Sequence, residues 1–485
     1  MSGATPGPAH AGVLAAVDLG ATSGRVILGR FDPAVGPGGL RLQHVARFPN
    51  DPVRTPDGLH WNLLELYRQV LDGLAAAERE APGEVLGVAI DSWAVDYGLL
   101  RAGRLLGAPY HYRDGRTAAG VQRVHARVDA AALYARNGLQ HLPFNTVFQL
   151  ATEGPLLDLA DRVLLVPDLL AHWLTGAEAA ERTNASTTGL LDPRTGEWDT
   201  GLADLVGIPA GILPPLVDPG ASLGVLRPDV AQHVGRALEV TAVGSHDTAS
   251  AVVAVPATER DAAYVSCGTW GLVGLELDAP VLTEDARVAG FTNEGGVDGR
   301  TRFLHNVMGL WLLSESIRTW ERESTDAQRS STLQELLAEA ARVTGPVTVF
   351  DVDDPRFLPP GDVPGRIADW CREHGRPVPA TRGEYVRSIV ESLAQAFADA
   401  VATAARLAGR PVAAIHVVGG GAQNTVLCQA TADRSGLPVV AGPVEATAIG
   451  NLLVQARARG LVDGDLEDLR AIVAAAFPPE RYLPR

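Results

Sequence analysis

The sequence predicts an α/β fold with two domains, and three observations lead to this prediction. Short apolar runs bounded by Gly or Pro alternate with longer stretches of helical periodicity. The chain has 485 residues, which is long for a single hydrophobic core. The segment 264–277 repeats the outline of the segment 17–29: a strand, a turn with glycine and threonine, and a second strand. Two related halves facing a cleft would bring these two turns opposite each other.

Buried strands and amphipathic helices can be placed in order along the chain. Five short apolar runs predict the strands Val13–Val17, Leu86–Ile90, Leu238–Val243, Ala262–Ser266 and Ala413–Val418. Apolar residues at helical spacing predict two helices, one through Leu63, Leu66, Val70 and Leu74 and one through Ile389, Leu393 and Phe397. A domain boundary is predicted within Ser250–Asp261, where a helical stretch ends at Pro256 among polar residues.

This boundary divides the chain into segments. Residues 1–12 are predicted to be a disordered N-terminus, residues 13–253 the first domain and residues 254–485 the second. The first dozen residues lack the basic start and the apolar core of a signal peptide, and no apolar run is long enough to cross a bilayer. A soluble, cytoplasmic protein is therefore expected.

The composition argues against several classes of protein. A net charge of −16 without a basic tract argues against nucleic-acid binding. Cys267, Cys371 and Cys428 lie far apart and form no CxxC pair, so reduced thiols are expected, with no disulfide framework and no zinc cluster. The chain has no lysine, which excludes a Walker A loop, a lysine nucleophile and a pyridoxal Schiff base. Phosphate would have to be held by arginine, backbone N–H groups and a metal ion.

The stretch "VDLGATSGRVILG", residues 17–29, has the composition of an anion-binding hairpin. Its small residues let successive N–H groups point into one concavity, Thr22 and Ser23 add hydroxyls, and Arg25 adds a charge. Asp18 follows the strand, where a carboxylate can hold Mg²⁺ directly or through water. The alternative is an ordinary hairpin with a solvated aspartate. Within a phosphate-binding hairpin, Arg25 could also point away and pair with a carboxylate.

The stretch "GSHDTASAV", residues 244–252, places an aspartate between a buried strand and a helix of small residues. Such strand ends often carry the chemistry of an α/β sheet, so Asp247 could act as a general base. It could equally be the N-cap of a helix that begins at Thr248. His246 could likewise be a structural histidine.

A third stretch, residues 417–451, runs from a strand into three glycines and a helix. This arrangement lets the backbone approach a nucleotide closely. The spacing does not match GxGxxG, which disfavours a dinucleotide fold.

A fourth stretch, "IDSWAVDYGLL" with "YHYRDGRT" after it, is rich in side chains that hydrogen-bond and stack. These are Asp91, Trp93, Asp96, Tyr97, Arg113 and Asp114. They could bind a polyhydroxylated ligand, or they could be buried aromatics with one surface ion pair.

Taken in order, the motifs of this chain resemble those of the FGGY carbohydrate kinases, in particular those that act on L-rhamnulose. The matching segments are "VDLGATSGR", "DSWAVDYG", "YRDGRT", "LPFNTVFQL", "PDLLAHWLTG", "TNASTTGLLD", "GSHDTASAV", "SCGTWGLVG", "TNEGG", "NVMGLWLL", "VVGGGAQN" and "AGPVEATAIGN". The resemblance implies two ribonuclease H-like domains of the actin, hexokinase and heat-shock-chaperone ATPase type, with an active-site cleft between them. Residues 13–253 would form the sugar and phosphate side and residues 254–485 the nucleotide side.

The resemblance also implies a role for each matching residue. The ATP contacts would be Ala21, Thr22, Ser23, Gly24, Arg25, Thr269, Ser314 and Gly420. The sugar contacts would be Ala94, Asp96, His246, Asp247, Thr248 and Asn306. Asp247 would be the catalytic base and Asp18 the carboxylate on the Mg²⁺ side. Two positions depart from the family pattern, Ala94 where glycine is usual and Ser314 where glutamine is usual.

The implied function is transfer of a phosphoryl group from ATP, with Mg²⁺, to the C1 hydroxyl of L-rhamnulose. A kinase for L-xylulose, D-xylulose or L-fuculose is the alternative, because Ala94 could narrow the sugar site. A non-catalytic sugar sensor on the same fold is a further alternative. The expected partners are the small ketose and ATP, with no nucleic acid and no membrane, in a monomer or small homo-oligomer.

Overall fold

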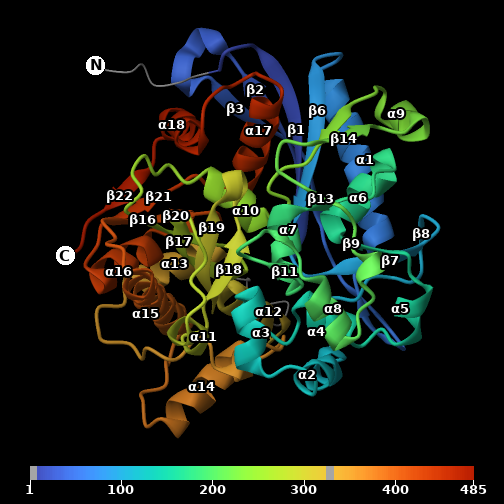
Figure 1. The fold of residues 1–485 in the computed structure, drawn as a ribbon. Coiled ribbons are helices and arrows are strands. Elements are labelled where there is room, and N and C mark those ends of the chain that lie inside the picture. Colours follow the sequence, from blue (N-terminus) through green and yellow to red (C-terminus); the bar gives the residue numbers. More distant parts are fainter. Residues whose placement is uncertain (1–7, 324–331) are drawn as a thin grey trace. The chain divides into compact units, whose positions relative to one another are not determined.

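The computed structural model describes residues 8–323 and 332–485 and divides them into two compact units (Figure 1). The first unit comprises residues up to Thr258, Glu276–Phe303 and Glu445–Pro478. The second comprises Glu259–Leu275, Leu304–Val444 and Pro479–Arg485. All five predicted strands are present, each within a few residues of its predicted bounds, and both predicted helices are present, since their marker residues lie in α1 (Leu63–Glu80) and α15 (Arg382–Ala408).

A six-stranded sheet forms the centre of the first unit, in the order β14-β15-β6-β1-β2-β3. Its strands are β1 (Gly12–Leu19), β2 (Ser23–Phe31), β3 (Leu40–Pro49), β6 (Val85–Ser92), β14 (Ser222–Val225) and β15 (Glu239–Thr241). The neighbours β15, β6 and β1 are parallel, and β2 returns antiparallel to β1. Seven of the eight residues of β1 are buried, as expected for a strand covered on both faces.

Helices α1 (Leu63–Glu80) and α17 (Ala446–Ala458) cover opposite faces of this sheet (Figure 1). Val26 of β2 lies against Gly73 of α1, whereas Gly29 of the same strand lies against Leu452 of α17. Because successive residues of a strand face opposite sides, an odd spacing puts the two helices on opposite faces. The second helix layer also contains α10 (Asp247–Val253), which packs closely on α17.

A seven-stranded sheet, in the order β18-β19-β17-β16-β20-β21-β22, contains the strands of the second unit. Its strands are β16 (Ala262–Cys267), β17 (Trp270–Leu277), β18 (Thr292–Gly295), β19 (Thr301–Met308), β20 (Ala414–Val418), β21 (Val439–Ala441) and β22 (Glu480–Tyr482). The division between the units passes through β17 and β19.

The two sheets have the same order and direction of strands over most of their width. In the second sheet β16 pairs antiparallel with β17 and parallel with β20, which is parallel to β21, and β22 forms an antiparallel edge. In the first sheet β1, β2, β6, β15 and β14 have the same relations. The repeat suggested by the segments 17–29 and 264–277 is therefore a repeat of topology, with those segments as the equivalent hairpins.

The remaining elements surround the two sheets. In the first unit these are η1 (Pro33–Gly38), β4 (Val53–Thr55), β5 (Gly58–His60), β7 (Tyr97–Arg101), β8 (Arg104–Leu105), α2 (Thr117–His125), α3 (Ala130–Asn137), α4 (Thr146–Leu150), α5 (Pro155–Leu159), β9 (Arg162–Leu165), α6 (Val166–Thr175), β10 (Ala180–Glu181), α7 (Arg182–Ala185), η2 (Ser186–Thr188), β11 (Leu191–Asp192), β12 (Glu197–Trp198), α8 (Thr200–Val206), η3 (Ala210–Ile212), β13 (Leu216–Val217), α9 (Pro228–Val234), α11 (Glu284–Val288), η4 (Val297–Gly299) and α18 (Leu466–Ala476). In the second unit they are α12 (Trp311–Glu323), α13 (Leu333–Ala341), η5 (Pro355–Phe357), α14 (Val363–Glu373), α15 (Arg382–Ala408), η6 (Gly420–Gln423) and α16 (Thr425–Ser435).

The compact units differ from the predicted division of the sequence at residue 253. Residues 276–303 and 445–478, predicted in the second domain, belong to the first unit. The physical reason is visible at α17, where Gln455 donates a hydrogen bond to the carbonyl of Ala15 in β1. Of the predicted N-terminal segment 1–12, residues 1–7 lie outside the described residues, and the amide of Ala9 donates to the carbonyl of Leu461.

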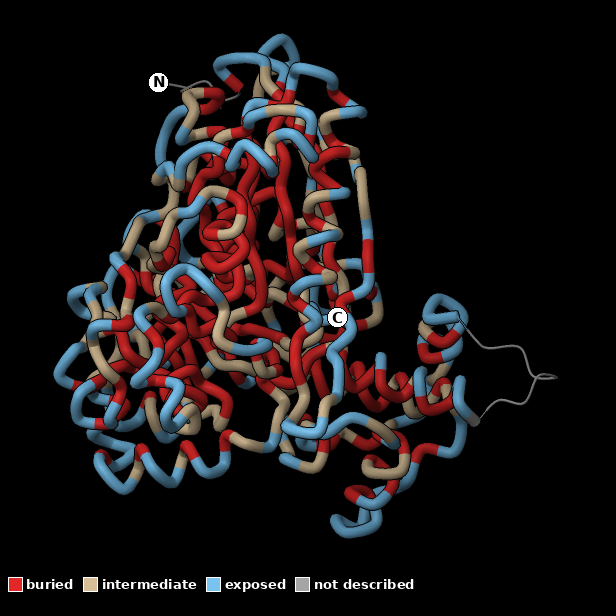
Figure 2. The backbone as a smooth tube through the Cα atoms, turned by 90° about the vertical axis from the view of Figure 1, so that its right-hand side faces the viewer, coloured by how far each residue is buried: buried red, intermediate tan, exposed pale blue. Residues whose placement is uncertain are grey.

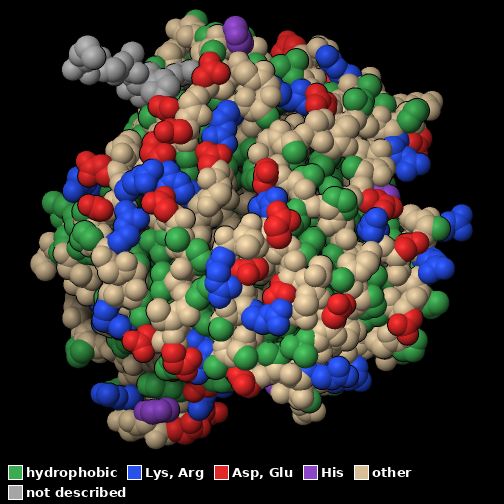
Figure 3. Space-filling view, in the orientation of Figure 1, with side chains coloured by type: hydrophobic (Ala, Val, Ile, Leu, Met, Phe, Trp, Pro, Cys, Tyr) green, Lys and Arg blue, Asp and Glu red, His purple; other side chains and the backbone are tan. Residues whose placement is uncertain are grey.

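Buried residues lie along the central strands and on the helix faces toward them, and exposed residues lie mainly at the outer turns (Figure 2). Acidic and basic side chains are interspersed on the face shown in Figure 3, without a continuous basic patch there. The three cysteines are buried, and none of them is joined to another. None of the described helices has the length and apolar character needed to cross a membrane.

Candidate active site

Three parallel strands of the first unit end side by side and carry polar residues at their carboxyl ends. Asp18 of β1 lies in register with Asp91 of β6. The next residue, Ser92, donates its amide to the carbonyl of Ser245, and it forms an isolated bridge with His246. The carboxyl ends of parallel strands are where open α/β sheets bind ligands.

Asp247 is the first residue of α10, and it does not cap that helix. The N-cap is His246, which makes no side-chain capping bond. The side chain of Asp247 is 31% exposed, and Thr248 Oγ donates to its Oδ1 at 3.1 Å. Burial raises the pKa of Asp247, with a further rise from Asp18 and an opposing effect of His246. A partly exposed carboxylate at this point has the access that a general base needs.

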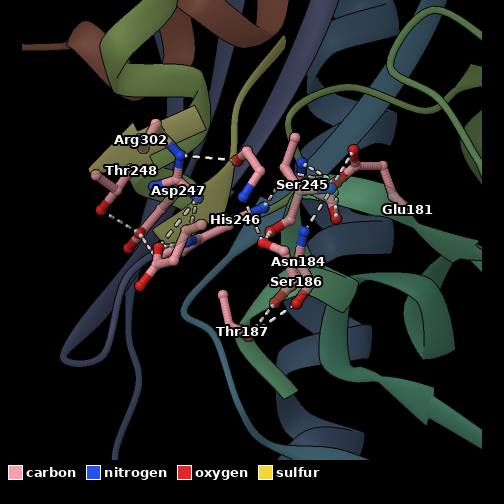
Figure 4. Close-up of polar contacts among 12 residues, drawn as sticks. Glu181, Asn184, Ser186, Thr187, Ser245, His246, Asp247, Thr248 and Arg302 are labelled. Atoms are coloured by element: carbon pink, nitrogen blue, oxygen red, sulfur yellow. Dashed lines mark hydrogen bonds and ion pairs between the residues drawn. The ribbon is translucent and has the colours of Figure 1, made fainter. Parts of the chain in front are cut away.

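The Nδ1 edge of the His246 ring lies against two buried charged residues, Glu294 and Arg302; His246 and Arg302 are labelled in Figure 4. Its Nδ1 lies 3.2 Å from Glu294 Oε2 and 3.1 Å from Arg302 Nη2, and its Nε2 lies 3.4 Å from Asp247 Oδ1. Burial would raise the pKa of Glu294, but Arg302 and His246 hold it below its ordinary value. Neither Glu294 nor Arg302 was identified from the sequence, since 48 and 56 residues separate them from His246.

A second buried carboxylate, Glu181, fixes the loop before the base (Figure 4). It accepts hydrogen bonds from the amide and hydroxyl of Ser245, both at 2.9 Å, and from the amides of Thr183 and Asn184. Its Oε2 also accepts from the Thr183 hydroxyl. No local pattern predicts this role, because Glu181 and Ser245 are 64 residues apart and meet only in the folded chain.

The hairpin between β1 and β2 turns at residues 20–22. Asn50 holds the turn, because its side chain donates to the carbonyl of Gly20 at 2.9 Å and its amide donates to that of Thr22. Arg25 lies in register with Asp18 and donates to its Oδ2 at 2.9 Å, and it also lies 3.1 Å from Glu445. In this structure Arg25 therefore pairs with carboxylates, which is the alternative that the sequence left open.

Replacing Arg25 with methionine should lower the Tm by several degrees in a buffer with EDTA. The change leaves Asp18, 2% exposed, and Glu445 without their cation, a cost of about 1–3 kcal/mol. Added Mg²⁺ should raise the Tm of Arg25→Met more than that of the wild type, because a divalent ion can replace the lost charge. Differential scanning fluorimetry with and without Mg²⁺ measures both effects.

Arg30→Met on the same strand is the matched control, because its partner Glu84 is 59% exposed. An unchanged Tm in Arg25→Met, together with a several-fold rise in the KM for ATP, would instead place Arg25 on the phosphates.

Asp91 lies beside Asp18 and is completely buried. Asn451 of α17 donates to its Oδ2 at 2.6 Å and is held in turn by Gln455, whereas Oδ1 has no hydrogen-bond partner. Burial and the Asp18 carboxylate raise the pKa of Asp91 well above its ordinary value. This orphaned oxygen next to Asp18 is compatible with a cation nearby.

The described residues contain no cluster of three or more protein ligands for a metal ion. Mg²⁺ in kinases is usually bound by one or two carboxylates, with water and phosphate oxygens completing its coordination. Asp18, with Asp91 beside it, fits that kind of site.

In the second unit, the predicted nucleotide residues lie around the equivalent hairpin. The carbonyls of Gly268 and Thr269 accept from the amides of Leu310 and Trp311, which begin α12. Ser314 is exposed in the first turn of that helix. Thr269, Ser314 and the hairpin are thus parts of one small region.

The glycines after β20 belong to the same region of the second unit. A side chain at Gly421 would meet Cys267 Sγ at 2.4 Å, whereas one at Gly420 would meet nothing closer than Leu310, at 3.9 Å. Gly420 is exposed and therefore open to a ligand, whereas Gly421 is buried and packs against Cys267. Asn306, the predicted sugar contact of this unit, is half-buried in β19.

Asp96, predicted to contact the sugar, is completely buried, and its carboxylate accepts four hydrogen bonds from protein groups. The donors are Trp61 Nε1 at 2.5 Å, Trp93 Nε1 at 3.1 Å, the Tyr112 amide at 3.1 Å and Gln149 Nε2 at 2.8 Å. The neighbouring turn holds Val95 at φ 66°, a strained conformation for a β-branched residue. Ala94, half-buried in that turn, stays a predicted sugar contact, as does Asp96.

The two sheets repeat one topology, and Asp18, Asp91 and Asp247 lie at or after the strand ends of the first unit. Models of the FGGY family of carbohydrate kinases match residues 13–254, for the N-terminal domain, and residues 263–459, for the C-terminal domain. The chain belongs to this family, and it is a carbohydrate kinase.

Curated relatives match nearly the whole chain. A rhamnulokinase from Bacteroides thetaiotaomicron is 40% identical over 476 residues, which covers 97% of this chain and 95% of that protein. A rhamnulokinase from Pectobacterium carotovorum is 42% identical over 478 residues, covering 97% and 93%.

Solved structures of sugar kinases share the fold at low sequence identity. The gluconate kinase from Lactobacillus acidophilus has a TM-score of 0.77 at 16% identity and covers 98% of this chain and 94% of its own. The xylulose kinase from Rhodospirillum rubrum has a TM-score of 0.75 at 21% identity with the same coverage. The predicted two-domain α/β fold of the FGGY kinases is therefore confirmed.

Proposed function

We propose that this protein phosphorylates L-rhamnulose at its C1 hydroxyl with ATP, giving L-rhamnulose 1-phosphate in the breakdown of L-rhamnose. The observation that carries the proposal is the 40–42% identity to rhamnulokinases over 97% of the chain. The geometry around Asp247 agrees with it, since the side chain of this carboxylate is 31% exposed and a general base must be within reach of the acceptor hydroxyl. Action in the cytoplasm stays a prediction.

Asp247 is the proposed base. O1 of the sugar forms its bond to the γ-phosphorus, the bond from that phosphorus to the bridging oxygen breaks, and ADP leaves with the electron pair. The O1 proton goes to the Asp247 carboxylate, the general base of the transfer, whose pKa is raised above the ordinary value by burial. His246 and Thr248 lie beside the base, where they would contact the sugar.

The phosphates of ATP are the proposed ligands of the turn from Ala21 to Gly24, through its amides and its two hydroxyls. Thr269 would contact the γ-phosphate, and Gly420 and Ser314 the rest of the nucleotide. Arg25 would also contact the phosphates once its hydrogen bond to Asp18 is broken. Phosphoryl transfer has a loose transition state, so alignment and charge stabilisation are the main tasks of these groups.

Mg²⁺ is the proposed metal, held on the protein side by Asp18. When bound, it supplies positive charge to the transferring phosphoryl group.

A kinase for another ketose is the second candidate, and one residue favours it. Ala94 adds a methyl group where glycine is usual in the family, close to the proposed sugar site. D-Xylulose, L-xylulose and L-fuculose differ from L-rhamnulose in length or in stereochemistry, so a narrowed site could select among them.

An assay of ADP release across a panel of these four ketoses tests the proposal. L-Rhamnulose should give the highest kcat/KM, and the product should carry phosphate at C1 by ³¹P NMR. Activity with only another ketose would keep the family and reject the proposed substrate. ATP hydrolysis that no ketose stimulates would reject both candidates.

A further inference from the structure

A chain of buried charged groups leads from the interior of the first unit to the proposed base (Figure 4). Arg302 of β19 is 0% exposed, and its Nη2 lies 3.1 Å from both Glu294 Oε2 and His246 Nδ1. Glu294 Oε2 lies 3.2 Å from the same Nδ1, and His246 Nε2 faces Asp247 Oδ1 at 3.4 Å. Four side chains, from β19, β18 and the start of α10, thus form one continuous path.

Burying these charged groups costs free energy that apolar side chains in the same place would not cost. A buried arginine is tolerated only when its charge is paired and its N–H groups are bonded, and an apolar side chain in its place is often as stable. Arg302 meets that condition in part, because its Nε donates to the carbonyl of Gly295 at 2.8 Å while Nη1 has no partner. Glu294 Oε2, also without a conventional hydrogen bond, directs its charge to Arg302 and His246. Both groups converge on one edge of the imidazole.

Because the imidazole ring is rigid, the contacts at Nδ1 also fix the direction in which Nε2 of His246 points. With Nδ1 held between Arg302 and Glu294, the Nε2 edge points at Oδ1 of Asp247. Thr248 Oγ donates to the same Oδ1. No side chain within the described part of the chain donates to Oδ2. The arrangement therefore separates the two oxygens of the base, one held by the protein and one open.

We propose that Glu294 and Arg302 are positioning residues for the phosphoryl transfer: they hold His246 against Oδ1 of Asp247 and so leave Oδ2 to take the proton of the sugar hydroxyl. The proposal rests on the proposed kinase function, in which Asp247 is the base. It assigns a positioning role to Glu294, the glutamate of the "TNEGG" segment, which the resemblance left without a role of its own. Neither residue touches the reacting atoms, and both act through His246.

A double-mutant cycle in kcat tests the proposal. Glu294→Gln keeps the size of the side chain and removes its charge, and it should lower kcat by about 10-fold, as is common for groups that orient a functional ligand. The KM for ATP should stay unchanged. In a His246→Ala background the same change should cost nothing more, because the residue through which Glu294 acts is already gone. Equal losses in both backgrounds would overturn the proposal.

Two further variants separate positioning from general stability. Glu276→Gln removes the partner of another buried arginine in the same unit, 2.8 Å from Arg470, and should leave kcat unchanged. Glu294→Asp keeps the negative charge but draws the carboxylate back from Arg302 and His246 alike, so kcat should still be lowered at a temperature at which the variant is fully folded. A wild-type kcat in Glu294→Asp, or a kcat loss in Glu276→Gln matching that of Glu294→Gln, would contradict the positioning role.

The cycle is measured with the acceptor that the wild-type protein phosphorylates fastest. If that acceptor is not L-rhamnulose, the proposed substrate fails while the cycle still tests the positioning role. If no acceptor is phosphorylated, the kinase function itself fails, and with it the basis of the inference.

Discussion

Replacing Asp247 with asparagine should lower kcat by at least ~10²-fold, the lower end of general-base contributions. The amide has the size of the carboxylate and can still accept from Thr248, but it cannot take a proton from the sugar hydroxyl. The KM values for sugar and ATP should change by less than about threefold, because the lost interaction forms only in the transition state. ADP release with saturating ATP and ketose measures both quantities.

Asp229→Asn provides the matched control for this change. Asp229 lies in the first turn of α9, a helix of seven residues like α10, so the substitution removes the same favourable charge from a helix N-terminus. Its kcat should equal that of the wild type. A near wild-type kcat in Asp247→Asn would show that another group takes the proton.

The parts of the fold encoded by short segments could be predicted from the sequence. Strand β1 and its hairpin follow from an apolar run and a cluster of small residues, and the equivalent hairpin at Gly268 follows from the same pattern. The place of Asp247 at a strand end could also be predicted, whereas the choice between base and helix cap could not. That choice depends on the backbone of His246, which takes the N-cap position itself.

The parts that join distant segments could not be predicted. Arg25 and Glu445 are 420 residues apart, and no local pattern relates them before the fold brings α17 against β1 and β2. The same holds for Asn451, whose amide reaches Asp91 across 360 residues. Such pairs explain why residues 445–478 belong to the first unit although the sequence places them in the second half.

Buried polar residues next to a site were the hardest to interpret. A carboxylate such as Asp96 looks the same in the sequence whether it binds a ligand or holds the protein together. Only the structure shows the four donors around it, two of them from tryptophans at Trp61 and Trp93.

Asp96→Asn should therefore destabilise the protein strongly. The amide offers one acceptor oxygen where the carboxylate offers two, and its NH₂ group would face other donors. With its oxygen in the place of Oδ2, which accepts three of the four bonds, the amide leaves Gln149 Nε2 unpaired and weakens the three bonds that the charge strengthens, at a cost of about 3 kcal/mol or more. Burial raises the pKa of Asp96 to about 6 against the effect of these donors, so the wild-type carboxylate is ionised at neutral pH. Thermal unfolding at pH 7.5, about 1.5 units above that pKa, should show a Tm many degrees below the wild type.

Asp168→Asn is the matched control, which separates the effect of the four donors around Asp96 on the Tm from that of replacing a buried aspartate. Asp168 is also buried, but it accepts one hydrogen bond, from the Glu181 amide, and its Oδ2 has no partner. Burial and the Glu181 charge raise its pKa well above the ordinary value, so Asp168→Asn removes an unfavourable charge and should keep or raise the Tm. If Asp96→Asn kept its Tm and instead raised the KM for the ketose, Asp96 would be a sugar ligand, as the resemblance implies. A large loss of Tm makes it the residue that holds the two tryptophans and the loop at Tyr112 in place, and any effect on sugar binding would follow from that.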